Sequence, residues 1–140
     1  MRAVIQRVTK GQVTAGESIV GEIQSGMCIL LGVGRHDDEA DADFLTEKIK
    51  NLRIFEDQQG KMNLSLLATG GEVLVVSQFT LYAGWKKGNR PSFVDAAAPA
   101  HAEKLYGLFH KAAPGSRVSV ATGQFQARMK VPSSMTDRLR

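Results

Sequence analysis

The chain has 140 residues, of which 43% are hydrophobic and 23% are charged, and its formal net charge is +4. These values are typical of one folded domain that buries a core without disulfides, and they exclude a disordered chain. No apolar run reaches the roughly 18 residues of a membrane span, and the N-terminus lacks the apolar segment of a signal peptide. We therefore expect a cytoplasmic protein with one domain, residues 1–140, and no membrane partner. The modest basic excess suits a polyanionic partner but does not require one.

The first part of the chain predicts strands followed by a helix. Residues 2–9 and 18–23 are predicted as strands joined through a turn region at residues 11–16. The apolar residues 27–33 predict a strand covered on both faces. Residues 37–39 (Asp-Asp-Glu) then begin a helix, because acidic side chains suit an N-cap and the positive end of the helix dipole. The apolar stripe of this helix consists of Leu45, Ile49 and Leu52.

The middle of the chain predicts a short strand and a long one. Residues 53–55 are expected to form the short strand, closed by a polar turn at residues 57–60. Residues 73–82 are expected to form one long strand that starts buried and turns polar midway. A glycine-containing basic loop follows at residues 83–91.

The last part predicts a second helix and two strands. Residues 99–113 form the helix, with Pro99 in the first turn, where proline is tolerated. Strands near residues 117–121 and 126–131 complete the fold. The predicted class is α+β: a mainly antiparallel sheet or partial β-barrel with two helices packed on it.

Two segments carry residues suited to chemistry. Polar side chains interrupt the core strand at residues 77–82 (Ser-Gln-Phe-Thr-Leu-Tyr), which indicates either a strand leaving the core or a site built at a strand end. In the loop at residues 85–93, Lys86, Lys87 and Arg90 lie next to aromatic residues. Such a loop suits backbone phosphates and an unstacked base, although a solvated loop has the same composition.

Other catalytic constellations are missing from the sequence. His36, His101, His110 and Cys28 lack the spacing of metal ligands, so we predict no metal and no cofactor. There is no nucleotide-binding glycine loop beyond a weak Gly-Val-Gly at residues 32–34, and no Gly-x-Ser-x-Gly motif.

Residues 77–82 resemble the signature of D-aminoacyl-tRNA deacylases. Similar segments occur in the family's order along about residues 1–131. They are residues 1–8, 51–57, 60–65, 88–93 and 122–125, with Met129 after them. The resemblance implies a homodimer of small barrels that needs no metal. Its substrate would be D-aminoacyl-tRNA, or glycyl-tRNA, whose ester to the terminal ribose it hydrolyses.

The resemblance also implies roles for individual residues. Ser77, Gln78, Phe79 and Thr80 would line the aminoacyl pocket. Main-chain N–H groups around Gln78 and Phe79 would stabilise the oxyanion, and such donors are often worth ~3–4 kcal/mol. Thr80 would act as a nucleophile, or alternatively the tRNA 2′-hydroxyl would assist attack by water.

More distant residues complete this expected site. Arg7 would support the pocket from the first strand, and Met129 would contact the substrate. We infer from charge alone that Lys86, Lys87 and Arg90 contact tRNA phosphates.

The C-terminal segment departs from the family. Members carry a strand reading approximately Ser-Leu-Val-Asn-Asp-Gly-Pro-Val-Thr, whose glycine and cis-proline reach into the neighbouring subunit's pocket and exclude L-amino acids. Residues 132–140 of this chain contain no Gly-Pro. Codons can be chosen for residues 131–140 such that one T inserted after a GTT codon for Val131 shifts the reading frame. The shifted frame then encodes the family segment. We therefore hypothesise a one-base deletion.

This departure leaves other functions open. We expect weakened hydrolysis or lost discrimination between D- and L-amino acids. The alternative is a catalytically impaired tRNA-binding member with the same fold, and a third possibility is a structural dimer with no RNA partner.

Overall fold

The computed structural model describes residues 1–113, 120–122, 129–130 and 133–134. Within these residues the strands are β1 (Arg2–Val8), β2 (Lys10–Ala15), β3 (Ser18–Ile23), β4 (Gly26–Gly32), β5 (Phe55–Glu56), β6 (Met62–Leu64), β7 (Glu72–Ser77), β8 (Val120–Thr122), β9 (Met129–Lys130) and β10 (Ser133–Ser134). The helices are α1 (Glu39–Asn51), α2 (Leu66–Thr69) and α3 (Pro99–Ala112), with a 3-10 turn, η1 (Phe79–Tyr82). The α+β class is confirmed, and the short helix α2 adds a third helix to the two expected.

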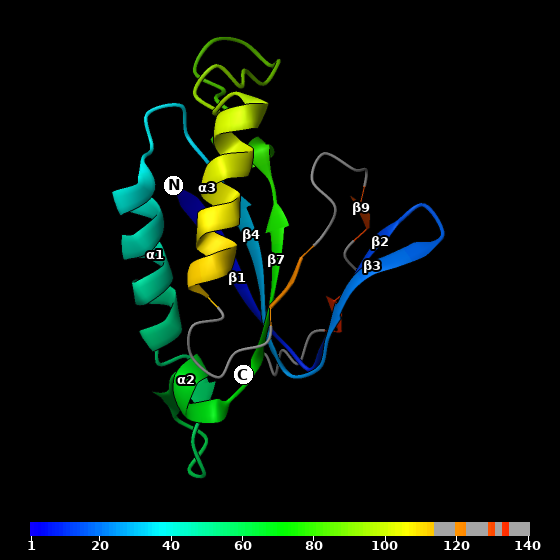
Figure 1. Cartoon of the computed structure of the whole chain (residues 1–140), viewed down its shortest axis with the longest axis vertical. Coiled ribbons are helices and arrows are strands. Elements are labelled where there is room, and N and C mark those ends of the chain that lie inside the picture. The colour runs from blue at the N-terminus through cyan, green and yellow to red at the C-terminus, as the bar shows by residue number, and fades with distance from the viewer. Residues whose placement is uncertain (114–119, 123–128, 131–132, 135–140) are drawn as a thin grey trace.

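The central sheet has the strand order β1-β4-β7-β8. Helices α1 and α3 lie side by side on one face, and the β2–β3 hairpin extends from the other side (Figure 1). Strand β1 pairs antiparallel with β4, whereas β4 with β7 and β7 with β8 are parallel. A parallel neighbour needs a long crossover, and the segments that contain α1 and α3 provide one for each parallel pair.

Apolar side chains fill both faces of this sheet. The cluster under the helices consists of Met27, Ile29, Leu31, Ile49, Leu66, Val73, Val75, Tyr106 and Phe109. The cluster on the opposite face consists of Val8, Val13, Ile23, Cys28, Leu74 and Val76. Strand β4 contributes to both clusters, which confirms the prediction that it is covered on both faces.

Local capping signals explain where the helices begin. The Asp38 carboxylate accepts from the Asp41 amide at 3.1 Å, and the Asp41 carboxylate accepts from the Asp38 amide at 2.9 Å. This capping box confirms the predicted start of α1 and is worth about 1 kcal/mol. In α3, Pro99 occupies the first turn as expected, and the Tyr106 hydroxyl donates to the Val75 carbonyl at 2.7 Å. This bond ties the helix to the sheet.

Two predicted boundaries in the first half of the chain are wrong. Residues 11–15 of the predicted turn region instead belong to β2, which pairs with β3. The turn is confined to Gly16, with φ of 62°, and Glu17, because buried Val13 holds β2 against the core. The predicted strand at residues 53–55 is observed only as Phe55–Glu56, paired with β6.

The long strand predicted at residues 73–82 is also wrong, because β7 ends at Ser77. Its neighbour β4 ends at Gly32, so the chain beyond Gln78 has no strand partner there. Gly32 leaves room for the turn that replaces the strand, since a Cβ there would lie 3.0 Å from Leu81 Cβ.

Most of the predicted C-terminal strands lie outside the described residues. Of residues 117–121 and 126–131, the structure describes β8 and β9 only. Residues 131–132 and 135–140, on which the family departure rests, are likewise not described, apart from the neighbouring β10. None of the helices in the described ranges is long and apolar enough to cross a membrane.

Candidate active site

Residues 77–82 lie at the end of the sheet where β4 and β7 stop and β1 begins. The register aligns Ser77 with Leu31 on β4, and Leu31 with Ala3 on β1. Turn η1 follows β7 directly, so it lies at the end of the sheet where the three adjacent strands β1, β4 and β7 begin or stop (Figure 1). This position at a strand end fits both interpretations of the segment, a strand that leaves the core and a site built at a strand end.

The main-chain amides of this segment differ in their partners. The Gln78 N–H donates to the Leu31 carbonyl at 2.8 Å, so it is not free to hold an oxyanion and that part of the expectation is wrong. The amides of Phe79 and Thr80 donate to no acceptor within the described residues. They are the first two N–H groups of η1, and the start of a helical turn leaves such donors unsatisfied. Two adjacent donors are thus available to a ligand.

The Thr80 hydroxyl is placed by a neutral partner rather than by a base. Its Oγ1 accepts a hydrogen bond from Nε2 of Gln78. Thr80 is exposed, and among the described residues no imidazole or carboxylate contacts its hydroxyl. A threonine nucleophile requires a group that removes its proton, and this geometry does not supply one.

An aromatic pair lies next to these amides. The rings of Phe79 and Phe93 are 5.2 Å apart between centroids, in an edge-to-face arrangement at 69°. Phe93 belongs to the family-like segment at residues 88–93, so the fold brings that segment into contact with residues 77–82. Phe79 remains 58% exposed, which leaves much of its ring free to contact a ligand.

The structure does not bring Arg7 or Met129 to this segment within one chain. Arg7 aligns with Met27 and Val73, four positions down the strands from the Ser77 row, or about 13 Å. Its guanidinium instead donates to the Ile54 carbonyl at 3.0 Å. Met129 lies in β9, which pairs with β2 in the other sheet.

The basic loop is a closed excursion beyond η1. Gly84 and Ser92 form its base through two backbone hydrogen bonds of 2.7 and 2.9 Å. Lys86, Lys87 and Arg90 are exposed and make no ion pair or hydrogen bond within the described part of the chain. Trp85 in the same loop is 64% exposed. The loop follows η1 directly in the chain, so it places cations and an exposed aromatic ring close to that turn.

A cluster behind η1 was not anticipated from the sequence. Tyr82 donates to Asp37 at 3.2 Å, and the guanidinium of Arg2 lies 4.4 Å from the centroid of its ring. Burial raises the pKa of Tyr82 to about 12, helped by the Asp37 charge. Asp37 had been assigned only to the start of the helix, and no local pattern signals a contact between residues 45 positions apart.

Burial alone would raise the pKa of Asp37, but its partners lower it below the usual value. These partners are the α-amino group of Met1, the Gly34 amide and the Tyr82 hydroxyl. Asp37 is therefore ionised at neutral pH, and its negative charge lies next to the positive charges of the Met1 α-amino group and Arg2.

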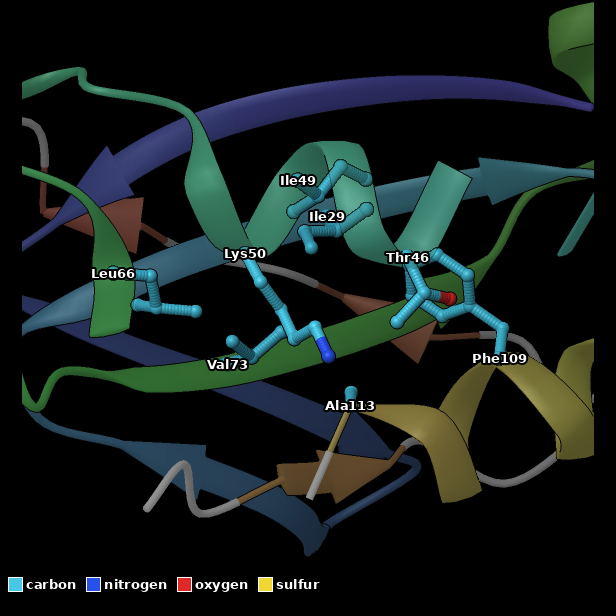
Figure 2. A pocket seen from close by; sticks show the side chains of 8 residues that line it. All are labelled: Ile29, Thr46, Ile49, Lys50, Leu66, Val73, Phe109 and Ala113. Carbon is cyan, nitrogen blue, oxygen red and sulfur yellow. The ribbon is translucent and has the colours of Figure 1, made fainter. Parts of the chain in front are cut away.

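The cavity shown in Figure 2 belongs to the core. It is lined by Ile29, Thr46, Ile49, Lys50, Leu66, Val73, Phe109 and Ala113. It lies between the sheet and the helices rather than beside η1, and its lining is mostly apolar. The Lys50 ammonium pairs with Glu47 at 2.5 Å. We assign this cavity no chemistry.

Comparison with known proteins identifies the family. The family model described as D-Tyr-tRNA(Tyr) deacylase matches residues 4–136. The chain belongs to this family. A D-aminoacyl-tRNA deacylase of Clostridioides difficile is 53% identical over 131 residues, which cover 94% of this chain and 88% of the relative. One of Heliobacterium modesticaldum is 55% identical over 131 residues, covering 94% and 87%. The resemblance found in the sequence is thereby confirmed.

Solved structures agree with this membership. A protein named c-Myc DNA Unwinding Element Binding Protein superimposes with a TM-score of 0.89 at 38% identity, covering 95% of this chain and 91% of that one. A probable eukaryotic D-amino acid tRNA deacylase superimposes with a TM-score of 0.79 at 16% identity, covering 96% and 93%, and this shows a shared fold alone.

Proposed function

We propose that this chain hydrolyses the ester of D-aminoacyl-tRNA, and of glycyl-tRNA, releasing the free amino acid and tRNA. Family membership supports the reaction class. The observation that carries the proposal is the pair of unsatisfied amides on Phe79 and Thr80 at the start of η1. The reaction takes place in the cytoplasm, where aminoacylated tRNA is used.

The chemistry needs an oxyanion hole more than a nucleophile from the protein. Water adds to the ester carbonyl carbon, and the carbonyl electrons move to the oxygen, which the Phe79 and Thr80 amides then stabilise. Collapse of this intermediate breaks the bond to the ribose oxygen, which leaves with a proton. Because no base contacts Thr80, the neighbouring ribose 2′-hydroxyl is the group that assists the water. One oxyanion donor is commonly worth about 3–4 kcal/mol of transition-state stabilisation.

We also propose that the working form is a homodimer. In the single chain Phe79 and Thr80 are exposed, so a ligand on η1 would be held from one side only. The edge strand β1 exposes Val4 at 49%, an apolar side chain on the face opposite the helices. A second copy packed there would cover Val4. A second chain would also contact the side of the ligand that this chain leaves exposed.

A basic loop next to the site favours a tRNA substrate. Lys86, Lys87 and Arg90 carry three positive charges with no partner in the described ranges, and phosphates are their natural ligands. Trp85 offers a face for an unpaired base. The alternative of an impaired member that only binds tRNA is not favoured, since relatives above 50% identity carry the name deacylase.

The test is hydrolysis of D-Tyr-tRNA and D-Asp-tRNA by the purified chain, with and without a chelator. We expect hydrolysis of both and no effect of the chelator. A substrate ending in 2′-deoxyadenosine separates the two mechanisms, because it keeps the ester and removes the assisting hydroxyl. We expect little hydrolysis of that substrate, whereas full activity on it would exclude assistance by the tRNA. Binding of tRNA at low salt without ester cleavage would contradict the proposed enzyme and restore the alternative.

A further inference from the structure

The Asp37 carboxylate joins separate parts of the fold through one oxygen atom. Oδ2 accepts a hydrogen bond from the Gly34 amide at 2.6 Å. The same atom lies 2.7 Å from the α-amino nitrogen of Met1 and 3.2 Å from the Tyr82 hydroxyl, which donates to it. The chain segment after β4, the start of β1 and the end of η1 therefore meet at a single acceptor.

The carboxylate itself is held in place by its own main chain. The Asp37 carbonyl lies 2.7 Å from Nε2 of His101, a residue in the first half of α3. The Asp37 side chain is only 16% exposed, and it lies just ahead of the capping box of α1. The acceptor is thus anchored to both long helices, so it can serve as a fixed point for the groups that bind it.

Three described contacts hold the partly buried Tyr82 side chain in place. The Arg2 guanidinium covers its ring at 4.4 Å and also donates to the Leu81 carbonyl at 2.8 Å. A Cβ on Gly34 would lie 2.8 Å from its hydroxyl oxygen, so the backbone at that point is already in contact with the ring. The position of Tyr82 is therefore set by Asp37, Arg2 and Gly34 together.

The two ends of η1 are too close to move independently. Phe79 and Tyr82 are its first and last residues, and three residues make one turn of a 3-10 helix. The Leu81 amide bonds to the Gln78 carbonyl at 3.3 Å and the Ala83 amide to the Thr80 carbonyl at 3.1 Å. A displacement of Tyr82 is thus transmitted to the Phe79 and Thr80 amides.

We propose that Asp37 is a positioning residue of the deacylase site, which acts through Tyr82 to fix the direction of the Phe79 and Thr80 N–H groups. Asp37 lies behind η1 and touches no reacting atom. This inference rests on the proposed function, because it assigns those two amides to the reaction. A carboxylate suits the position because it is an acceptor for three donors at once, and hydrogen bonds to a charged acceptor are about twice as strong as neutral ones.

The kinetic test compares Asp37→Asn, Tyr82→Phe and the double variant with the unaltered chain on D-Tyr-tRNA. Misplacement of a site by about 1 Å costs up to about a hundredfold in rate, so we expect each single variant to lose about ten- to a hundredfold in kcat. KM is expected to change little, because the cations of the 83–91 loop are untouched. The double variant should be no slower than the slower single variant, since both changes break one connection.

The matched control is Asp57→Asn. Asp57 also carries a carboxylate whose pKa is lowered by hydrogen bonds, here from the Lys61 and Gln59 amides and from Asn63. It lies in the β5–β6 hairpin, at the opposite end of the molecule from η1 (Figure 1). We expect this variant to lose stability while its kcat stays within about twofold of the unaltered chain.

A second readout does not depend on activity. The chain has two tyrosines, so a spectrum of tyrosine labelled with ¹³C at Cζ has two signals, and Tyr82→Phe assigns them. In Asp37→Asn the Tyr82 signal should titrate at lower pH. Hydrogen exchange at the Leu81 and Ala83 amides, which are hydrogen-bonded within the turn, should be faster in both single variants and unchanged in Asp57→Asn.

The measurements on the variants test the positioning role, and hydrolysis by the unaltered chain tests the proposed function. Unchanged exchange at η1 in either single variant, or a kcat that stays within about twofold in Tyr82→Phe, overturns the positioning role. Multiplied losses in the double variant also overturn it, because they show two independent effects. Absence of hydrolysis by the unaltered chain instead refutes the proposed function, and the exchange data then still decide whether Asp37 holds η1.

Discussion

Gly34 lies so close to Tyr82 that a Cβ atom added to it would be 2.8 Å from the tyrosine hydroxyl oxygen. The Gly34→Ala variant must therefore move the ring or the segment that follows β4. Overpacking of this kind costs about 1–3 kcal/mol. We expect a loss of that size in the free energy of unfolding, measured by urea denaturation.

Gly107→Ala is the matched control for this substitution. Gly107 lies inside α3, and a Cβ there would meet no atom within 4 Å. Replacing a helical glycine with alanine in open space stabilises by about 0.5–1 kcal/mol. Equal effects of the two substitutions would show that the contact with Tyr82 is not what requires glycine at position 34.

Thr80→Ala separates a hydroxyl nucleophile from a main-chain oxyanion hole. The variant keeps the Thr80 amide and removes the group that accepts from Gln78. We expect kcat on D-Tyr-tRNA to fall less than about tenfold, since loss of a true nucleophile costs about a millionfold. A covalent aminoacyl-enzyme trapped by acid quenching of the unaltered chain would refute this expectation.

The three loop cations should contribute to binding rather than to chemistry. Replacing Lys86, Lys87 and Arg90 with alanine should raise KM for aminoacyl-tRNA and leave kcat nearly unchanged. The slope of log affinity against log salt should become shallower by about 2–3, because each phosphate contact contributes about 0.7–0.9.

A charge-matched control uses three exposed lysines outside the loop, Lys48 in α1, Lys61 between β5 and β6, and Lys111 in α3. Their triple alanine variant has the same net charge as the loop variant but keeps the loop intact. We expect a smaller change in the salt slope. Equal slopes for the two triple variants would mean that overall charge, not the loop, attracts the tRNA.

The low pKa of Asp37 predicts acid sensitivity. A folded-state pKa below the unfolded value of about 3.9 means that the carboxylate stabilises the fold fully above that pH. This contribution is lost as pH falls through the folded pKa. The difference in free energy of unfolding between the unaltered chain and Asp37→Asn should therefore be constant near pH 6–7 and shrink below about pH 4.

The C-terminal departure predicts a defect in selectivity. Residues 132–140 contain no Gly-Pro, the pair to which the family resemblance assigns the exclusion of L-amino acids. We expect this chain to hydrolyse D-Tyr-tRNA more slowly than a version that ends Val-Ser-Leu-Val-Asn-Asp-Gly-Pro-Val-Thr from Val131 on, and to distinguish it poorly from L-Tyr-tRNA. Full D-selectivity of the present chain would show that the segment is dispensable. Sequencing the DNA behind residues 130–140 tests the proposed deletion separately, since codons that cannot be shifted into the family reading would exclude it.

Features predicted from the sequence were those encoded by neighbouring residues. The buried strand β4 was predicted because an apolar run of that length needs cover on both faces, and α1 because Asp38 caps it. Residues 77–82 were singled out because they place polar groups where a core strand should continue, and the family resemblance then indicated a site there. Each of these signals spans fewer than ten residues.

Only the tertiary structure decided where that strand stops and which groups surround the site. β7 ends at Ser77 because its partner β4 ends at Gly32, a limit set by residues more than 40 positions away. The same holds for the contact of Tyr82 with Asp37 and for the placement of Arg7 beside Ile54. Local sequence specifies conformation and burial through steric and hydrophobic preference. Contacts between distant segments depend on how the strands pair, which a short pattern does not contain.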